Sequence, residues 1–174
     1  TFPPFFLILC IAIKIDSKGP IFFCQKRVGI HKKHFNILKF RTMRIDTPKD
    51  CPTHLLENPE QYITKVGKFI RKTSLDELPQ VLNILVGQMS IVGPRPERPY
   101  YVDKFKEEIP RYMIKHQVRP GITGWAQVNG YRGDTSIYKR IECDLYYIEN
   151  WTVLFDIKIL FFTVFKGFIN KNAY

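Results

Sequence analysis

The chain has 174 residues, which suffices for one domain with a hydrophobic core and is short for two. Hydrophobic residues make up 45% of the chain, a share that excludes an intrinsically disordered protein. The 27 lysines and arginines outnumber the 16 acidic residues and give a formal net charge of +11. This surplus predicts an anionic partner, whether nucleic acid, a phosphorylated metabolite or an anionic membrane surface.

The N-terminus carries an unbroken apolar run at residues 5–13. As a helix it would be about 14 Å long, against roughly 30 Å of bilayer hydrocarbon, so it cannot span a membrane. We expect either a buried core helix or, preferably, a truncated membrane-associated segment. Pro3 and Pro4 would kink a helix entering from upstream, and the chain starts abruptly at Thr1 without a methionine.

Two strands are expected next, at residues 21–25 and 35–43, joined by a basic connection that contains glycine. Alternation along the second strand, FNILKFRTM, places four side chains on one face: Phe35, Ile37, Lys39 and Arg41. The two cations are either solvated charges of an edge strand or part of a site. The polar residues 44–64, with three prolines, predict a surface loop or a mobile lid.

A short basic helix is expected at residues 66–72, and a second helix from Ser74 to a stop at Gly87. Leucines recur along the second at helical spacing: Leu75, Leu78, Leu82 and Leu85. Residues 90–92 predict a strand that leads into Gly93-Pro94-Arg95-Pro96, where the two prolines restrict the backbone of Arg95.

The C-terminal half is expected to be helical at residues 101–116, with a break at Pro110, and again at 137–147 and 151–169. Four glycines between them suit a backbone that closely approaches a ligand or another segment: Gly121, Gly124, Gly130 and Gly133. The last helix is apolar, rich in aromatic residues and carries lysines. It is either a helix at a membrane interface or a buried core helix.

Other classes of site find little support. The cysteines form no Cys-x-x-Cys pair and are expected to be reduced cytosolic thiols: Cys10, Cys24, Cys51 and Cys143. The histidines show no His-Glu-x-x-His spacing, so no zinc site is expected. Neither Gly-x-x-x-x-Gly-Lys-Ser/Thr nor Gly-x-Gly-x-x-Gly occurs, which argues against ordinary kinases and dinucleotide-binding proteins.

Asp76 and Glu77 lie side by side at the start of the leucine-rich helix. Ser74 and Glu77 have the spacing of a capping box, in which Glu77 would reach back to the Ser74 amide. Asp76 would then add favourable charge at the helix N-terminus. The other interpretation is chemical, because a carboxylate can attack phosphorus and Mg²⁺ is typically held by one or two carboxylates plus substrate phosphates.

Constrained cations favour the chemical interpretation. Five of them lie in segments restricted by proline, glycine or strand alternation: Lys39, Arg41, Arg71, Arg95 and Arg119. Arginine binds phosphate oxygens in a bidentate way, so these residues are candidates for binding a diphosphate beside the two acids.

The stretches SLDELPQVLNILVGQMSIVGPRP and RPGITGWAQVNG, with KFRTM and GPIFFCQKRVG, closely resemble the bacterial sugar transferases, the monotopic phosphoglycosyl transferases. The resemblance extends from about Pro4 to Tyr174. It implies a helix-rich α+β fold with short strands, amphipathic interfacial helices and an N-terminal re-entrant membrane helix. Residues 1–14 would be its outgoing arm, the incoming arm being absent, and residues 15–174 the catalytic domain.

The resemblance implies an enzyme on the cytoplasmic face of the bacterial inner membrane. It would move a sugar-1-phosphate from a UDP-sugar to undecaprenyl phosphate and release UMP, a first membrane step in the assembly of exopolysaccharide, capsule or glycoconjugates. Asp76 would be the nucleophile and form a sugar-phosphoryl-aspartate, while Glu77 would help to bind Mg²⁺. Membrane lipid is an expected partner and nucleic acid is not.

The assignments of the basic site residues differ in how well the resemblance supports them. Lys39, Arg71 and Arg95 match basic positions of the family, whereas Arg41 and Arg119 are our own weaker additions. Asp156, in LFDIKI, matches an acidic position to which we assign no role. UDP-glucose and UDP-galactose are the expected donors, although the sugar stays open, as does an assembly such as a homodimer.

Two other functions stay open from the residues alone. A non-catalytic basic module that binds anionic lipid or nucleic acid would explain the charge of +11. A glycosyltransferase that moves the sugar without its phosphate would release UDP in place of UMP.

Overall fold

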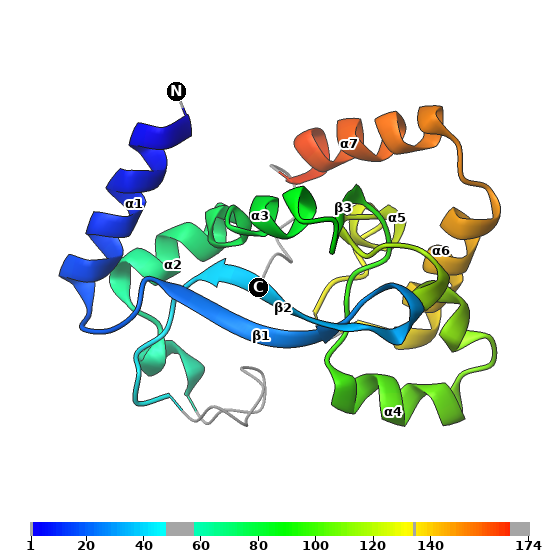
Figure 1. Ribbon diagram of the computed structural model, residues 1–174, viewed down its shortest axis with the longest axis horizontal. Helices are drawn as coiled ribbons and strands as arrows, with labels where there is room; N and C mark the ends of the chain where they lie inside the picture. The colour runs from blue at the N-terminus through cyan, green and yellow to red at the C-terminus, as the bar shows by residue number, and fades with distance from the viewer. Residues whose placement is uncertain (1, 48–57, 134, 168–174) are drawn as a thin grey trace. The chain divides into compact units, whose positions relative to one another are not determined.

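The computed structural model describes residues 2–47, 58–133 and 135–167 (Figure 1). Helices predominate, and two small two-stranded sheets accompany them in the described residues, which confirms the expected helix-rich α+β class. The chain divides into two compact units, one formed by residues 1–24 and 38–79 and the other by residues 25–37 and 80–174.

In the first unit, helix α1 (Phe2–Asp16) packs against helix α2 (Lys65–Lys72). Four buried side chains form the core: Leu9, Ile13, Phe40 and Ile70. Other apolar side chains of α1 face away from this core and are exposed: Phe5, Leu7, Ile8, Ile11 and Ile15. Helix α1 is therefore a core helix along one side only, and its apolar surface continues onto the exposed side.

The start of α2 is held by side chains from two segments. Thr64 caps the helix, its Oγ1 accepting a hydrogen bond from the Gly67 amide at 2.9 Å, and the Asp16 carboxylate accepts one from the Val66 amide at 2.8 Å. A Cβ atom on Gly67 would lie only 2.1 Å from the carbonyl oxygen of Thr42. Glycine thus allows α2 to approach the chain that follows the second strand.

The two N-terminal strands are confirmed, with shifted ends, as β1 (Phe22–Val28) and β2 (His34–Phe40). They pair with each other, and the short 3-10 helix η1 (Ile30–Lys32) joins them. So short a connection makes them a hairpin, because parallel strands need a much longer crossover. Of the expected loop 44–64, residues 48–57 lie outside the described residues, and 3-10 helix η3 (Pro59–Tyr62) lies in the remainder.

In the second unit, strands β3 (Ser90–Val92) and β4 (Gly121–Thr123) pair in parallel. A Cβ atom on Gly121 would lie 2.2 Å from the Gly93 nitrogen, and one on Gly124 would lie 2.2 Å from the Gly93 carbonyl oxygen. The predicted close approach to another segment is confirmed for Gly121 and Gly124, and the segment approached is the one that follows β3. At Gly130 and Gly133 an added Cβ atom would meet nothing within 4 Å, and both residues have positive φ.

The second unit also contains these helices: α3 (Gln80–Leu85), α4 (Pro99–Glu108), α5 (Trp125–Val128), α6 (Ile137–Glu149), α7 (Val153–Gly167) and the 3-10 helix η5 (Tyr112–Gln117). Helix α7 contacts both strands of the pair. The break expected at Pro110 separates α4 from η5. Helix α7 buries Ile159 completely, yet it leaves a row of large apolar side chains exposed: Leu154, Ile157, Phe161, Val164 and Phe165.

Within the described residues, no helix combines the length and apolar character that a membrane crossing requires.

Candidate active site

The acidic pair lies on a short 3-10 helix, η4 (Leu75–Glu77), which packs against α2 in the first unit. Ser74 precedes it in the left-handed conformation, with φ 56° and ψ 17°, so the chain turns sharply between the two helices. Leu75 and Leu78 pack against the core of this unit and anchor the turn. Asp76 and Glu77 are consequently buried, with 5% and 6% of their surfaces exposed.

The helix predicted to run continuously from Ser74 to Gly87 is wrong. Helix η4 and helix α3 are separate, and Pro79 lies between them, where its nitrogen has no N–H group to continue the helical hydrogen bonds. The leucine stripe also divides, since Leu82 and Leu85 are 48% and 75% exposed.

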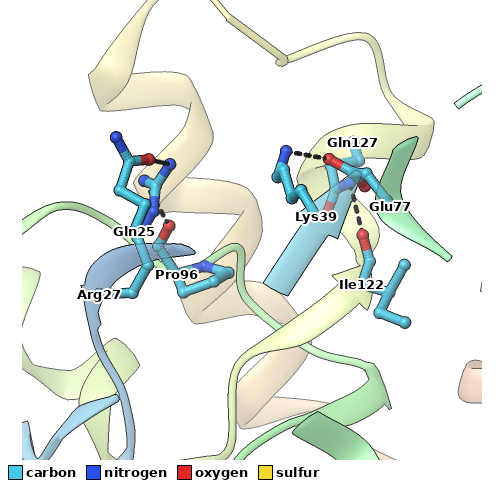
Figure 2. A network of polar contacts seen from close by, with 7 residues as sticks. All are labelled: Gln25, Arg27, Lys39, Glu77, Pro96, Ile122 and Gln127. Atoms are coloured by element: carbon cyan, nitrogen blue, oxygen red, sulfur yellow. Dashed lines mark hydrogen bonds and ion pairs between the residues drawn. The ribbon is translucent and has the colours of Figure 1, made fainter. Parts of the chain in front are cut away.

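The capping box is also wrong. No side-chain cap is formed by Ser74, and its amide donates to the carbonyl oxygen of Arg71. The Glu77 carboxylate instead accepts a hydrogen bond from the ammonium group of Lys39 at 2.8 Å (Figure 2). Glu77 therefore faces the end of β2.

Arg41 and Lys39 make different contacts, although alternation assigned them to one strand face. Arg41 is buried just beyond β2, and its guanidinium donates to the carbonyl oxygens of Lys18 at 2.5 Å, Ser17 at 2.7 Å and Ile13 at 3.5 Å. Ile13 belongs to the last turn of α1, and Ser17 and Lys18 directly follow this helix, where a cation is favoured by the helix dipole. Arg41 thus has a structural role, and its assignment to substrate binding stays a prediction.

The other predicted cations lie in different settings. Arg71, in the last turn of α2, is half-buried, and its guanidinium lies 3.8 Å from the sulfur of Met43. Arg95 and Arg119 belong to the second unit, where Arg95 is half-buried and Arg119 is exposed. Their roles toward a substrate stay predictions.

Two buried ion pairs in the second unit were not anticipated from the sequence. Lys115 pairs with Asp144 at 2.9 Å, each side chain being only 2% exposed. Arg140 pairs with Glu97 at 3.0 Å, with 12% and 10% exposed. A signal did exist, because Asp144 interrupts an apolar stripe on the helix that was predicted at residues 137–147.

These charges shift the pKa values of their neighbours. Burial disfavours ionisation of Glu97, but Lys115, Arg140 and Arg27 together hold the pKa of its carboxyl below the usual value. Burial, assisted by the charge of Lys115, lowers the pKa of His116 to about 4. At neutral pH, Glu97 is therefore an anion and His116 a neutral imidazole.

Asp156, for which the sequence suggested no role, has a clear structural one. It lies in the first turn of α7, where a negative charge is favourable. Its carboxylate accepts hydrogen bonds from the Tyr147 hydroxyl at 2.8 Å and from the Trp151 indole at 3.2 Å. Asp156 thereby links the end of α6 to the start of α7.

The two acids are the candidate metal ligands of this site. Among the described residues, no group of three or more histidine, cysteine, aspartate or glutamate side chains could hold a metal ion. Asp76 and Glu77 offer two adjacent carboxylates, which suits Mg²⁺ when phosphate oxygens complete its shell.

Comparison with known proteins identifies the family. The model of the bacterial sugar transferases matches residues 1–170. The chain is 49% identical, over 98% of its length, to a UDP-glucose:undecaprenyl-phosphate glucose-1-phosphate transferase of Escherichia coli strain K12, and spans 38% of that protein. It is 45% identical, over 94% of its length, to an Aeromonas hydrophila UDP-N-acetylgalactosamine-undecaprenyl-phosphate N-acetylgalactosaminephosphotransferase, and spans 39% of that relative.

A third relative is nearer in length. The chain is 45% identical, over 96% of its length, to an uncharacterized sugar transferase of Bacillus subtilis strain 168, and spans 78% of it. A match over nearly the whole chain, to the family model and to these relatives, shows that this protein belongs to the bacterial sugar transferase family.

Proposed function

We propose that this chain transfers a sugar-1-phosphate from a UDP-sugar to undecaprenyl phosphate and releases UMP. One observation carries the proposal: the buried Asp76–Glu77 pair, whose second member is held by Lys39 at 2.8 Å. Two acids buried beside a cation suit a nucleophile and an electrostatic partner. The names of the relatives, which act on undecaprenyl phosphate with glucose or N-acetylgalactosamine donors, support the same reaction.

In the first step, a carboxylate oxygen of Asp76 attacks the β-phosphorus of the UDP-sugar. The bond from that phosphorus to the bridging oxygen breaks, UMP leaves with the bridging oxygen, and a sugar-phosphoryl-aspartate forms. In the second step, a phosphate oxygen of undecaprenyl phosphate attacks the same phosphorus. The acyl–phosphate bond breaks, the carboxylate of Asp76 is restored, and undecaprenyl-diphospho-sugar is the product.

The remaining groups orient the Glu77 carboxylate and neutralise the charge of the substrate diphosphate. The ion pair with Lys39 restricts the rotamer of Glu77, so that its carboxylate is held in one orientation beside the nucleophile. Arg71 and Arg95, with weaker roles for Arg41 and Arg119, would bind the phosphate oxygens. Mg²⁺, held by Glu77 and by substrate phosphates, would supply further neutralisation of the diphosphate charge.

The lipid acceptor suggests where the protein acts. We propose the cytoplasmic face of the bacterial inner membrane, with residues 1–14 belonging to a membrane-associated segment. Exposed apolar side chains support this on each unit taken separately, such as Ile8 and Ile11 on α1 and Phe161 and Phe165 on α7. Large apolar surfaces of this kind are typical of interfacial helices.

The test of the proposal is Asp76→Asn, supplied with UDP-glucose or UDP-galactose, Mg²⁺ and undecaprenyl phosphate. The variant should remain folded and release no UMP above background, because an amide cannot serve as the nucleophile. Unchanged release of UMP would rule out Asp76 as the nucleophile. Release of UDP by the wild-type protein would indicate a glycosyltransferase that leaves the phosphate behind.

A salt and metal titration separates the enzyme from a non-catalytic basic module. Binding to nucleic acid through charge alone weakens steeply with salt and needs no metal. UMP release should instead depend on Mg²⁺ and cease when the metal is chelated. Affinity for nucleic acid without any UMP release would favour the basic module.

A further inference from the structure

The loop at residues 93–97 accepts hydrogen bonds at three of its backbone carbonyls, all from donors in the second unit. The Pro94 carbonyl accepts from the Gly121 amide at 3.0 Å. The Pro96 carbonyl accepts from the guanidinium of Arg27 at 3.1 Å (Figure 2), and the Glu97 carbonyl from the Val28 amide at 3.0 Å. The Gly93 amide adds a donor, to the Thr123 carbonyl oxygen at 2.9 Å, whereas Pro94 and Pro96 have no N–H group to donate.

The side chain of Glu97 adds a further attachment, and it is buried. Its carboxylate accepts from the guanidinium of Arg140, on α6, at 3.0 Å. Replacing one partner of such a pair leaves an uncompensated charge away from water, so the pair resists separation. Arg140 also donates to the Gly133 carbonyl, which limits the movement of its own guanidinium.

Arg95 lies close to the buried charged residues of the second unit. Together with Lys115 and His116, it lines a small cavity of about 10 Å³ that also contacts Pro94 and Pro96. A space of this size holds about one water molecule, so the side chain of Arg95 has little freedom on that side.

We propose that Glu97 and Arg140 are positioning residues for Arg95. Their ion pair fixes the loop two residues after Arg95, and so sets where the Arg95 guanidinium is presented to the substrate diphosphate. The role rests on the proposed function, in which Arg95 binds phosphate. A guanidinium displaced by 1 Å would neutralise the reacting phosphates poorly, a misplacement that can cost about 100-fold in rate.

The central test is a double-mutant cycle between Glu97→Gln and Arg95→Ala, read as kcat and KM for the UDP-sugar. Glu97→Gln keeps the shape of the side chain and removes its charge, and should lower kcat/KM by about 10- to 100-fold, mainly through kcat. In the Arg95→Ala background it should have at most about a twofold further effect. Full additivity of the two losses would overturn the proposal, because Glu97 would then act independently of Arg95.

A matched control is available in the same unit. Arg111 and Glu149 form an arginine–glutamate pair as well, but on the surface, with 58% and 49% exposed. Glu149→Gln should leave kcat/KM within about twofold of the wild type. Arg140→Lys, which keeps the charge, should retain more activity than Arg140→Met, a difference that a purely steric role would not produce.

Two further readouts keep the test decisive. If the wild-type protein released no UMP, the proposed function would fail, whereas an active wild type with an unaffected Glu97→Gln variant would refute only the positioning role. If the variants do not fold, hydrogen exchange of the wild type decides. The amides of Gly121 and Val28, which donate to the loop, should exchange as slowly as those of β3, and exchange at the rate of an unprotected amide would contradict a fixed loop.

Discussion

The ammonium group of Lys39 lies 2.8 Å from Oε1 of Glu77, which follows it by 38 positions in the chain. The two side chains are 18% and 7% exposed, so both charges are largely removed from water. Breaking a buried ion pair of this kind changes the free energy of unfolding more than breaking one on the surface. Breaking a buried pair leaves a charge without compensation, whereas exposed pairs contribute little.

Lys39→Met should therefore lower the free energy of unfolding by about 1–3 kcal/mol, because Glu77 loses a buried cationic partner. The midpoint of urea unfolding measures this loss. Lys68→Met is the control, since Lys68 pairs with Glu60 at 3.0 Å where both side chains are more than 70% exposed. The control should change stability by about 0.5 kcal/mol or less, and equal losses in the two variants would contradict the expected difference.

Arg41→Met should destabilise the protein by about 3 kcal/mol, because it leaves the carbonyl oxygens of Ser17 and Lys18, directly after α1, without their charged donor. The loss should concentrate locally, as faster hydrogen exchange in the last turn of α1. Arg41→Lys should fall between the wild type and Arg41→Met, since an ammonium group keeps the charge but lacks the planar fork. A variant with unchanged stability and lost activity would favour substrate binding over the structural role.

His116→Gln should make stability less sensitive to acid. Burial and the charge of Lys115 lower the pKa of His116 from 6.5 to about 4 in the folded protein. Between these values the unfolded chain binds a proton that the native protein excludes, so the wild type loses stability as the pH falls, by at most about 1.4 kcal/mol per pH unit.

Urea unfolding of wild type and His116→Gln at several pH values between 6.5 and 4.5 measures this effect. The nearby acids Glu97 and Asp144 titrate in both proteins, so the difference between the two slopes isolates the histidine. Equal slopes would show that His116 takes up its proton at the same pH in the native protein and in the unfolded chain.

Gly121→Ala should disrupt the pairing of β3 with β4. The added Cβ atom would lie 2.2 Å from the Gly93 nitrogen and 2.5 Å from the Thr123 carbonyl oxygen, both backbone atoms that cannot move aside. We expect a loss of more than about 3 kcal/mol or a failure to fold. Thermal unfolding and the yield of soluble protein measure the outcome.

Gly130→Ala is the matched control. Gly130 has φ +87°, and its added Cβ atom would meet nothing within 4 Å, so only the backbone conformation opposes the change. This should cost about 1 kcal/mol. If the two alanine variants were equally stable, close backbone approach would not be what requires glycine at Gly121.

The sequence alone determined the local features of this protein. Strand alternation and helical spacing located both N-terminal strands, β3, α2 and α6 to within a few residues, because these periods follow from backbone geometry. The acidic pair and the Gly93-Pro94-Arg95-Pro96 loop were equally visible, since chemistry and proline restrict the residues themselves. The resemblance carried by these motifs agrees with the family that the comparisons identify.

The partner of each buried charge was decided only by the tertiary structure. A capping box and a pair with Lys39 were both compatible with the local pattern around Glu77, because a glutamate side chain reaches either way. The same holds for Arg41, which alternation assigned to a strand face and which instead donates to the carbonyl oxygens of Ser17 and Lys18, directly after α1. Glu97 and Arg140 are 43 positions apart, and no local period relates them. Glu97 and Arg140 come into contact because the packing of the second unit buries both charges, and each buried charge requires a partner of opposite sign.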